Sequence, residues 1–581
     1  MLYNAKKLMS DPSNQDEKIT YFAETDARDK RVKFGIKAQD RTRHVYVIGK
    51  TGMGKSTLLE NMAVQDVQNS EGLAFVDPHG KSAELLLEYI PKERINDVIY
   101  FAPFDTDYPV SFNVMEDVGP EKRHLVANGL MSAFKKIWVD AWSARMEYIL
   151  NNTLLALLEY PESTLLGVNR MLSDKWYRQK VVSNISDPSV KSFWTDEFEK
   201  YGERYMQEAG AAIQNKVGQF TANPLVRNIV GQRHSSFDVR KIIDEKKILI
   251  ANLSKGKVGE QNANLLGSML ITKIYLGALS RADVNAAGLT KLPNFYLFVD
   301  EFQSFANESF ADILSESRKY KLNLTIAHQY VDQMSEEVRS AVFGNVGTTI
   351  AFRVGPLDAE LLEKIFFPTF TAEDLVNLGR YQTYLTLMID GIGSQPFSAV
   401  SLPPIEKPAE SFHDRIIESS RKSFARPKDK VEEEIKAWYL EGGEERTAFD
   451  KKKRRSGSPR FGEAAGGQDR GEMKKALFEA IQTGAAVPVQ ESSPVSSAVT
   501  LQETAKKHHG GDKKHDFKKP SVQNVSALKE ALSSLGVRSE SGEQNKPPEH
   551  KKEEPKKEHQ PNNHPNEIPE DELRKILAID E

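Results

Sequence analysis

Residues 45–57 join an apolar strand, a glycine-rich turn and the start of a helix, and the turn has the spacing G-x-x-x-x-G-K-S. Glycines let the backbone N–H groups of such a turn point at phosphate oxygens, because no Cβ stands in the way. The helix that starts near Lys55 adds its positive dipole end. The Lys55 ammonium would reach the β- and γ-phosphates, and the Ser56 hydroxyl would complete the shell of a Mg²⁺ ion. The stretch therefore predicts a phosphate-binding loop, or P-loop, for a nucleoside triphosphate, with contacts from Gly49, Thr51, Gly52, Gly54, Lys55, Ser56 and Thr57.

Polar side chains at the ends of later apolar strands complete this chemistry. The run 294–299 ends in Asp300 and Glu301. With a P-loop upstream, Asp300 is expected to hold Mg²⁺ through its water shell and Glu301 to polarise the attacking water. The run 322–327 leads to Gln329, which could sense the γ-phosphate or orient water. Asp77 also ends a strand, at the edge where open α/β sheets bind ligands.

Two further charged features have weaker support. Arg318 lies near the end of a predicted helix, from which it could reach a neighbouring subunit. A surface polar group is an equal alternative for both Arg318 and Gln329. Lys255 and Lys257 lie in a basic, glycine-containing loop that could contact a phosphate backbone, although most such loops are only connectors. The basic run 41–44 is predicted to be a solvated strand edge.

The elements that must position these residues alternate between strand and helix, which predicts a mainly parallel sheet. The 581 residues are too many for one core, so several units are expected. Residues 18–120 and 221–404 form the predicted nucleotide-binding domain. Residues 121–220 have apolar side chains at helical spacing and no strand run, so they are predicted to form an all-helical insert.

The two ends of the chain differ from this core. Residues 1–17 form a polar leader, and residues 405–581 are rich in charge, proline and serine. Such a composition buries too little surface to offset the entropy of ordering, so this tail is predicted to be largely disordered. Its short helical islands are expected at 429–440, 473–483, 522–535 and 569–579.

Composition excludes several classes of function. The chain has no cysteine, which excludes disulfides, thiolate metal sites and cysteine catalysis, and fits a reducing cytoplasm. No uninterrupted apolar run approaches the length of a transmembrane helix. The net charge of -4 gives no global attraction to nucleic acid, so any DNA contact must be local.

In combination, these motifs resemble the HerA/FtsK superfamily of DNA-pumping ATPases, and within it most closely the TraG/TraD-type coupling ATPases of type IV secretion and conjugation. The resemblance covers about residues 18–403 and rests on the P-loop, Asp77-Pro78-His79-Gly80, the helical insert, Asp300-Glu301-Phe302, Arg318-Lys319-Tyr320 and Ala327-His328-Gln329.

The resemblance implies an α/β, RecA-like P-loop NTPase that forms a hexameric ring, with ATP and Mg²⁺ at subunit interfaces and DNA in the central channel. It implies that Arg318 is the arginine supplied in trans and Gln329 the catalytic glutamine, with Arg353 a second candidate for the trans arginine. Secretion-apparatus or relaxosome proteins would be partners of the tail.

One departure is that membrane-bound coupling proteins begin with transmembrane helices, whereas this sequence predicts none. The expected location is therefore the cytoplasm, with any membrane association through partners. Three alternatives stay open: a secretion or pilus-assembly ATPase acting on protein, a soluble HerA-like DNA-processing translocase, and a scaffold in which ATP only stabilises the fold.

Overall fold

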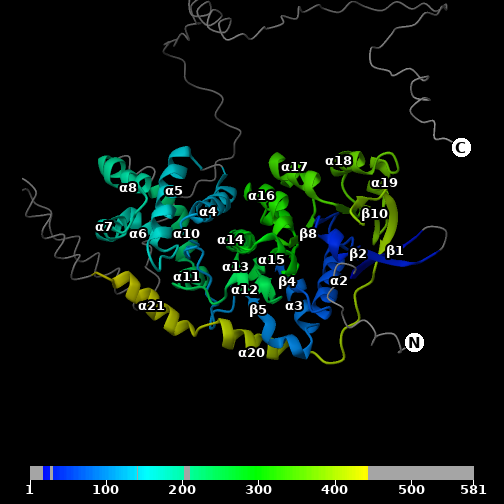
Figure 1. Ribbon diagram of the computed structural model, residues 1–581, viewed down its shortest axis with the longest axis horizontal. Coiled ribbons are helices and arrows are strands. Elements are labelled where there is room, and N and C mark those ends of the chain that lie inside the picture. The colour runs from blue at the N-terminus through cyan, green and yellow to red at the C-terminus, as the bar shows by residue number, and fades with distance from the viewer. Residues whose placement is uncertain (1–17, 27–29, 140–141, 202–209, 443–581) are drawn as a thin grey trace, which may run out of the picture. The chain divides into compact units, whose positions relative to one another are not determined.

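Parallel strands make up one side of an 11-stranded sheet in the computed structural model, which describes residues 18–26, 30–139, 142–201 and 210–442 (Figure 1). The strand order is β2-β1-β13-β10-β9-β3-β8-β7-β4-β6-β5. From β9 to β5 every pairing is parallel, and the pairings on the other side, from β9 through β10, β13 and β1 to β2, are antiparallel. The predicted mainly parallel α/β fold is therefore confirmed. The strands are β1 (Ile19–Thr25), β2 (Lys33–Lys37), β3 (Val45–Ile48), β4 (Gly72–Asp77), β5 (Val98–Phe101), β6 (Ile248–Asn252), β7 (Phe295–Val299), β8 (Leu322–His328), β9 (Thr348–Ala351), β10 (Gln382–Thr386) and β13 (Phe397–Ser401).

Helices cover both faces of this sheet, and the strand side chains alternate between two apolar cores. In β3, for example, Val45 and Val47 face one core while Tyr46 and Ile48 face the other. The first core includes α2 (Lys55–Gln68) and α3 (Lys81–Glu88). The second includes α12 (Val239–Asp244), α14 (Glu260–Leu279), α16 (Ser309–Glu316), α17 (Glu336–Asn345), α18 (Pro356–Phe366) and α19 (Ala372–Asn377).

Short elements join these helices and strands. They are α1 (Ala38–Arg41), α13 (Lys255–Val258), α15 (Ala286–Lys291), the hairpin β11 (Met388–Ile389) and β12 (Ile392–Gly393), and 3₁₀ turns at η3 (Lys92–Asp97), η8 (Ser280–Asp283), η9 (Phe302–Ser304), η10 (Ser317–Tyr320) and η11 (Val331–Gln333).

Between β5 and β6 the regular elements of the described residues are all helices, in the region where the sequence predicts the insert. Its first helix, α4, packs against α14, one of the helices that cover the sheet. The apolar side chains of the insert belong to the same core as α14, so the insert is continuous with the larger domain. The helices are α4 (Arg123–Ile137), α5 (Ala144–Glu159), α6 (Gly167–Ser173), α7 (Lys175–Ser183), α8 (Pro188–Ser192), α10 (Ala211–Ala222) and α11 (Pro224–Val230), with π- and 3₁₀-helical turns at η5 (Phe193–Glu197) and η6 (Phe198–Lys200).

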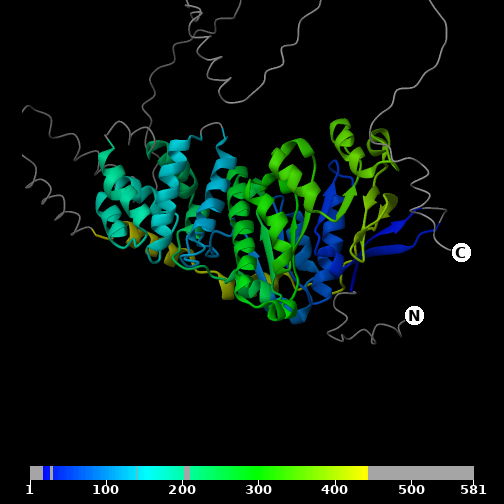
Figure 2. The same ribbon diagram turned by 45° about the horizontal axis from the view of Figure 1, so that its top comes forward.

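Residues 405–442 form a strap that begins beside the sheet and ends on the insert (Figures 1 and 2). Its first helix, α20 (His413–Phe424), packs against β5 and η3. The backbone N–H of Tyr100 donates to Ser420 Oγ at 2.9 Å, and Arg421 pairs with Asp105 at 2.7 Å. This end of the strap therefore completes the edge of the sheet.

The second helix of the strap, α21 (Lys428–Leu440), packs against the insert. Val431 and Ile435 are buried against Leu166. The Arg170 guanidinium donates to the backbone oxygens of Trp438 and Glu441, at 2.8 and 2.9 Å. The helix α21 coincides with the first helical island predicted in the tail, whereas α20 was not predicted. The other predicted islands and the leader lie outside the described residues.

One helix of the described residues is long and apolar enough to span a membrane by length and composition alone. It runs from Glu260 to Asp283, and 67% of its apolar window is buried inside the fold. It packs against α4 and α12 as a core helix.

The basic run before β3 differs from the predicted solvated edge, because Arg41 and His44 are each only 1% exposed. The Arg41 guanidinium binds both oxygens of Asp66 at 2.6 and 2.8 Å and lies 3.7 Å from the centre of the Tyr296 ring. His44 Nδ1 accepts from the backbone N–H of Leu324 at 3.1 Å, which places its proton on Nε2. The Arg41 guanidinium and the His44 ring are therefore both held by polar partners inside the fold.

Candidate functional site

The predicted P-loop lies at the carboxyl edge of the parallel strands, between β3 and α2. The N–H of Gly49 donates to the oxygen of His328 at 3.2 Å, and the N–H of Lys50 donates to the oxygen of Arg353 at 2.8 Å. The ends of the two neighbouring strands therefore hold the loop. Gly54 has φ of 124°, which L side chains rarely adopt, and it is the residue from which α2 starts.

Lys55 is nearly buried, at 5% exposure. Its ammonium donates to the backbone oxygen of Gly49 at 2.6 Å and to that of Lys50 at 3.3 Å. Burial lowers its pKa, and the nearby carboxylates of Glu301 and Asp300 oppose that shift. A phosphate bound in the loop would compete with these backbone oxygens for the ammonium.

Ser56 and Asp300 meet at the start of α2, where the Ser56 hydroxyl donates to Asp300 Oδ2 at 2.9 Å. Asp300 is 3% exposed, and burial raises its pKa to about 6, with further contributions from the charges of Glu301 and Asp77. A buried carboxylate with negative neighbours is a site where a cation is stabilising.

Mg²⁺ fits this arrangement. The described residues contain no group of three or more His, Asp or Glu that could hold a metal by itself. Mg²⁺ does not need one, since it keeps several waters and binds one or two protein oxygens together with substrate phosphates. The Ser56 hydroxyl and the Asp300 carboxylate are hard oxygen donors of that kind.

A line of hydrogen bonds connects the P-loop to Glu301. The Thr51 hydroxyl donates to Gln329 Oε1 at 3.1 Å, and the Gln329 amide donates to Glu301 Oε1. The amide of Gln303 donates to the other carboxylate oxygen, Oε2, at 2.5 Å. Glu301 has left-handed backbone angles, with φ of 48°, and is 7% exposed. Backbone strain of this kind is common at functional sites.

β8 brings Gln329 to Glu301, because β8 lies between the P-loop strand β3 and β7, and Asp300 and Glu301 directly follow β7. The sequence alone did not identify Gln303. Its position two residues after Glu301 was visible, but the turn that directs its amide back to the carboxylate was not.

Asp77 lies near this site, but both of its carboxylate oxygens already accept hydrogen bonds from backbone N–H groups. Its Oδ1 accepts from the N–H of His79 at 2.7 Å, and its Oδ2 accepts from the N–H of Ala83 at 3.0 Å. These contacts order the turn into α3, so Asp77 shapes the edge of the site and adds negative charge near Asp300. His79 Nε2 is 3.9 Å from Glu301 Oε1.

The two candidate arginines lie at opposite edges of the sheet. Arg318 is on η10, directly before β8 begins, so the seven residues of β8, or about 20 Å, separate it from the edge that carries Gln329. Arg318 is thus not brought to the P-loop of its own chain. Arg353 follows β9 and lies beside that P-loop through its backbone contact with Lys50.

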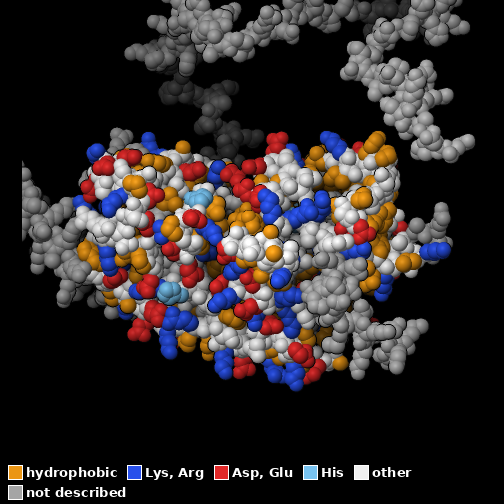
Figure 3. Space-filling view, in the orientation of Figure 1, with side chains coloured by type: hydrophobic (Ala, Val, Ile, Leu, Met, Phe, Trp, Pro, Cys, Tyr) orange, Lys and Arg blue, Asp and Glu red, His pale blue; other side chains and the backbone are white. Residues whose placement is uncertain are grey.

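The two lysines named as possible DNA contacts, Lys255 and Lys257, both have partners within the chain. Lys255 pairs with Glu260 at 3.1 Å and donates to Ser304 Oγ at 2.9 Å. The Lys257 ammonium lies 4.0 Å from the centre of the Phe104 ring. On the face in Figure 3, basic and acidic side chains are interspersed.

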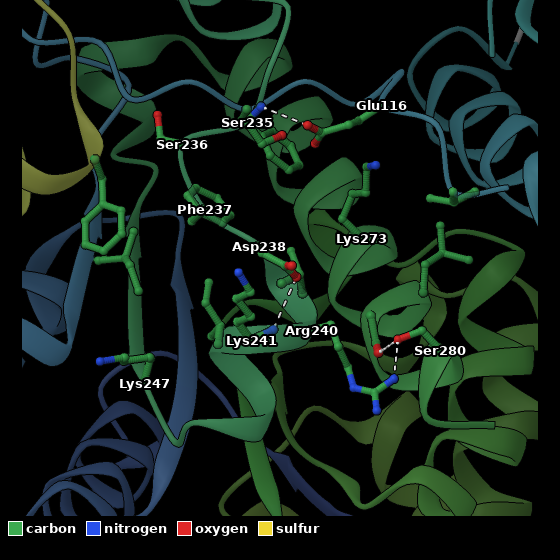
Figure 4. Close-up of a pocket in the computed structure, with 18 of the residues that line it drawn as sticks. Glu116, Ser235, Ser236, Phe237, Asp238, Arg240, Lys241, Lys247, Lys273 and Ser280 are labelled. Atoms are coloured by element: carbon green, nitrogen blue, oxygen red, sulfur yellow. Dashed lines mark hydrogen bonds between the residues drawn. The ribbon is translucent and has the colours of Figure 1, made fainter. Parts of the chain in front are cut away.

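A separate cavity of about 750 Å³ shares no residue with this site (Figure 4). It lies where β5 and β6 meet α12, α14 and the segment before α4. Lys273 and Arg240 lie on different helices around it, and Arg240 donates to Ser280 Oγ at 2.9 Å.

Comparison with known proteins relates this geometry to a family. The family model described as the type IV secretion-system coupling protein DNA-binding domain matches residues 32–366, more than half of the chain. No curated protein matches the sequence.

Among solved structures, the unbound bacterial conjugative coupling protein TrwBdeltaN70 has 14% sequence identity and a TM-score of 0.49, over 64% of this chain and 87% of that chain. Plasmid coupling protein TrwB in complex with ADP and Mg²⁺ has 13% identity and a TM-score of 0.48, over 68% and 98%. VirB4 of Thermoanaerobacter pseudethanolicus has 14% identity and a TM-score of 0.42, over 67% and 97%. By the extent of the family-model match, the chain belongs to the type IV secretion-system coupling protein family.

Proposed function

We propose that the chain is an ATP-hydrolysing motor that binds and moves DNA as a coupling ATPase of type IV secretion or conjugation. The observation that supports hydrolysis most is the line of hydrogen bonds from Thr51 through Gln329 to Glu301, beside the Ser56–Asp300 pair. The DNA-binding description of the family supports the choice of DNA as the substrate.

Each polar group has a task in this proposal. The P-loop N–H groups and Lys55 bind the phosphates, and Gln329 holds both the P-loop and Glu301 in register. The Glu301 carboxylate accepts a proton from the attacking water as that water approaches the γ-phosphate. Bound Mg²⁺, held by Ser56 and through water by Asp300, would offset the negative charge of the phosphates.

The position of Arg318 favours a site shared between copies of the chain. An arginine supplied in trans stabilises the charge that develops on the transferred phosphoryl group. Since Arg318 lies at the far edge of the sheet from its own P-loop, only another copy could place it at a nucleotide. We therefore propose a homo-oligomeric ring, most simply a hexamer.

DNA would be held mainly through its phosphates, because a motor must move along any sequence. Its binding should be nearly independent of sequence and weaken as salt rises. We further propose that the motor acts in the cytoplasm and meets secretion-apparatus or relaxosome proteins through residues after 442.

The test is the rate of ATP turnover of the purified chain without DNA, with single-stranded DNA and with double-stranded DNA, together with the mass of the assembly. We expect stimulation by DNA and a ring mass. Lys55→Ala should abolish turnover. ATP turnover that does not respond to either form of DNA would contradict the proposed substrate, and unchanged turnover by Lys55→Ala would contradict the proposed site.

A further inference from the structure

A lysine of the insert contacts the backbone of the turn that follows Glu301. Lys136 lies in the last turn of α4, and its ammonium donates to the backbone oxygen of Gln303 at 2.5 Å and to that of Ala306. Burial, with a smaller contribution from the positive charge of Lys255, lowers the pKa of Lys136 to about 8. Removing an ammonium from water costs free energy unless hydrogen-bond acceptors replace the water. The two backbone oxygens are the acceptors of Lys136.

That turn sets the direction of the Glu301 carboxylate. The backbone N–H of Ser304 donates to the backbone oxygen of Glu301 at 2.8 Å, and this hydrogen bond closes the 3₁₀ turn η9. The side chain of Gln303 then reaches back to Glu301 Oε2 at 2.5 Å. Moving the Gln303 backbone would therefore move a donor on which Glu301 depends.

Two lysines hold the turn from different elements. Lys136 holds its backbone from the insert, and Lys255 of α13 donates to Ser304 Oγ. The contact from the insert joins residues 167 positions apart in sequence. It therefore connects α4 directly with the turn beside Glu301.

We propose that Lys136 is a positioning residue for Glu301, acting through the Gln303 turn, so that ATP turnover depends on how the insert is seated on the nucleotide-binding domain. This inference rests on the proposed function and adds a route of control to it. The ammonium of Lys136 binds the backbone of the turn, so its effect passes through the turn.

The neighbouring lysine provides a matched control. Lys135 is on the same helix but forms a surface ion pair with Glu308 at 3.0 Å, with side-chain exposures of 41% and 52%. Exposed pairs of this kind contribute about 0–1 kcal/mol. Lys135→Met and Lys136→Met remove the same charge from adjacent positions, and only the second disturbs the Gln303 turn.

The first measurement is ATP turnover, with binding of a non-hydrolysable analogue followed in parallel. Lys136→Met should lower kcat by about 10- to 100-fold with KM and analogue affinity unchanged, because a small misplacement of a catalytic group has effects of this size. Lys135→Met should match the wild type, and Lys136→Arg, which keeps the donors, should restore most of the rate. A kcat for Lys136→Met equal to that of Lys135→Met would overturn the inference.

A second variant tests the path itself. Gln303→Leu breaks the link between the turn and Glu301 without touching the insert. If Lys136 acts through Gln303, the double variant should be no slower than the slower single variant, since coupled residues are not additive. Fully additive losses would show that Lys136 acts by another route.

Amide hydrogen exchange over residues 299–306 separates this inference from the proposed function, because it needs no ATP turnover. Exchange there should be faster in Lys136→Met than in Lys135→Met. Equal exchange in the two variants would overturn the positioning role even in a chain that hydrolyses ATP. If the wild type does not turn over ATP but the two variants differ in exchange as expected, only the ATPase proposal is contradicted.

Discussion

Replacing Glu301 by glutamine tests the hydrolysis site most directly. Both carboxylate oxygens accept hydrogen bonds from amides, one from Gln329 and one from Gln303. Glutamine can satisfy only one of them, because its NH₂ group would face a second NH₂ donor. The variant thus loses the negative charge and one charge-assisted hydrogen bond, the latter contributing about 1.5–3 kcal/mol.

The loss of the base determines the size of the effect. A positioned general base contributes about 10²- to 10⁴-fold, or roughly 3–5 kcal/mol of the barrier. We therefore expect Glu301→Gln to lower kcat by at least about 100-fold. Nucleotide binding should persist, because the P-loop and Lys55 are unchanged.

The assay is phosphate release at saturating ATP in the presence of DNA, alongside binding of a fluorescent non-hydrolysable analogue. Glu308→Gln is the control, since that carboxylate is exposed and pairs only with Lys135 among the described residues. It should turn over ATP at the wild-type rate. If Glu301→Gln keeps its rate within about threefold of that control, Glu301 is not the base and the proposed order of proton transfer is refuted.

The remaining predictions concern the subunit interface and two buried polar groups. Arg318→Ala should bind ATP without turning it over, and mixing it with Lys55→Ala should restore activity, because each defect then lies in a different shared site; no rescue would contradict action in trans. Burial lowers the pKa of His44 from 6.5 to about 4, so the folded state resists protonation of this side chain. The unfolded chain takes up the proton below about pH 6.5, and stability is therefore lost as the pH falls from there toward 4. Urea unfolding at about pH 7 and pH 5 should show wild type losing about 2 kcal/mol more than His44→Asn, and equal losses would contradict this. Asp66→Asn should lower the free energy of unfolding by about 3–5 kcal/mol, since it leaves Arg41 buried without its partner, whereas an apolar replacement of both residues should recover much of that loss in the same assay.

Much of the site was predictable from local sequence. Gly54, Lys55 and Ser56 have a fixed spacing because a phosphate needs backbone N–H groups, a positive charge and a hydroxyl from one short loop. Asp300 and Glu301 were predictable for a similar reason, because they end an apolar run. The rest of the site depends on a shared sheet edge, which the parallel fold provides.

Contacts between distant elements were not predictable. In the sequence, Lys136 looks like an ordinary charged residue at the end of an amphipathic helix. Its acceptors are backbone oxygens, and no pattern of side chains indicates their position. Arg41 reads as part of a solvated basic run, since its partner Asp66 lies on another helix. Only the folded chain shows that Arg41 is buried against Asp66 and that Lys136, half-buried, donates to backbone oxygens.

The helix α20 was missed for a related reason. Of its residues, only Ile416 and Ser420 are buried, so little in its sequence distinguishes it from a charged tail. Its order comes from the sheet edge, where Ser420 completes the hydrogen bonding of β5 and Arg421 pairs with Asp105. Tertiary contacts thus supply what local composition lacks.

The strap changes how the stability of the insert is distributed. Without it, the insert would join the larger domain only through the two connections that flank it and the packing of α4, an arrangement that permits separate melting. The buried Arg170 ties two backbone oxygens at the end of the strap to the insert, while Tyr100 and Arg421 tie its start to the sheet. Residues after 404 therefore contribute part of the free energy that keeps the insert folded. Because the strap binds both the insert and the sheet, the two form one cooperative unit.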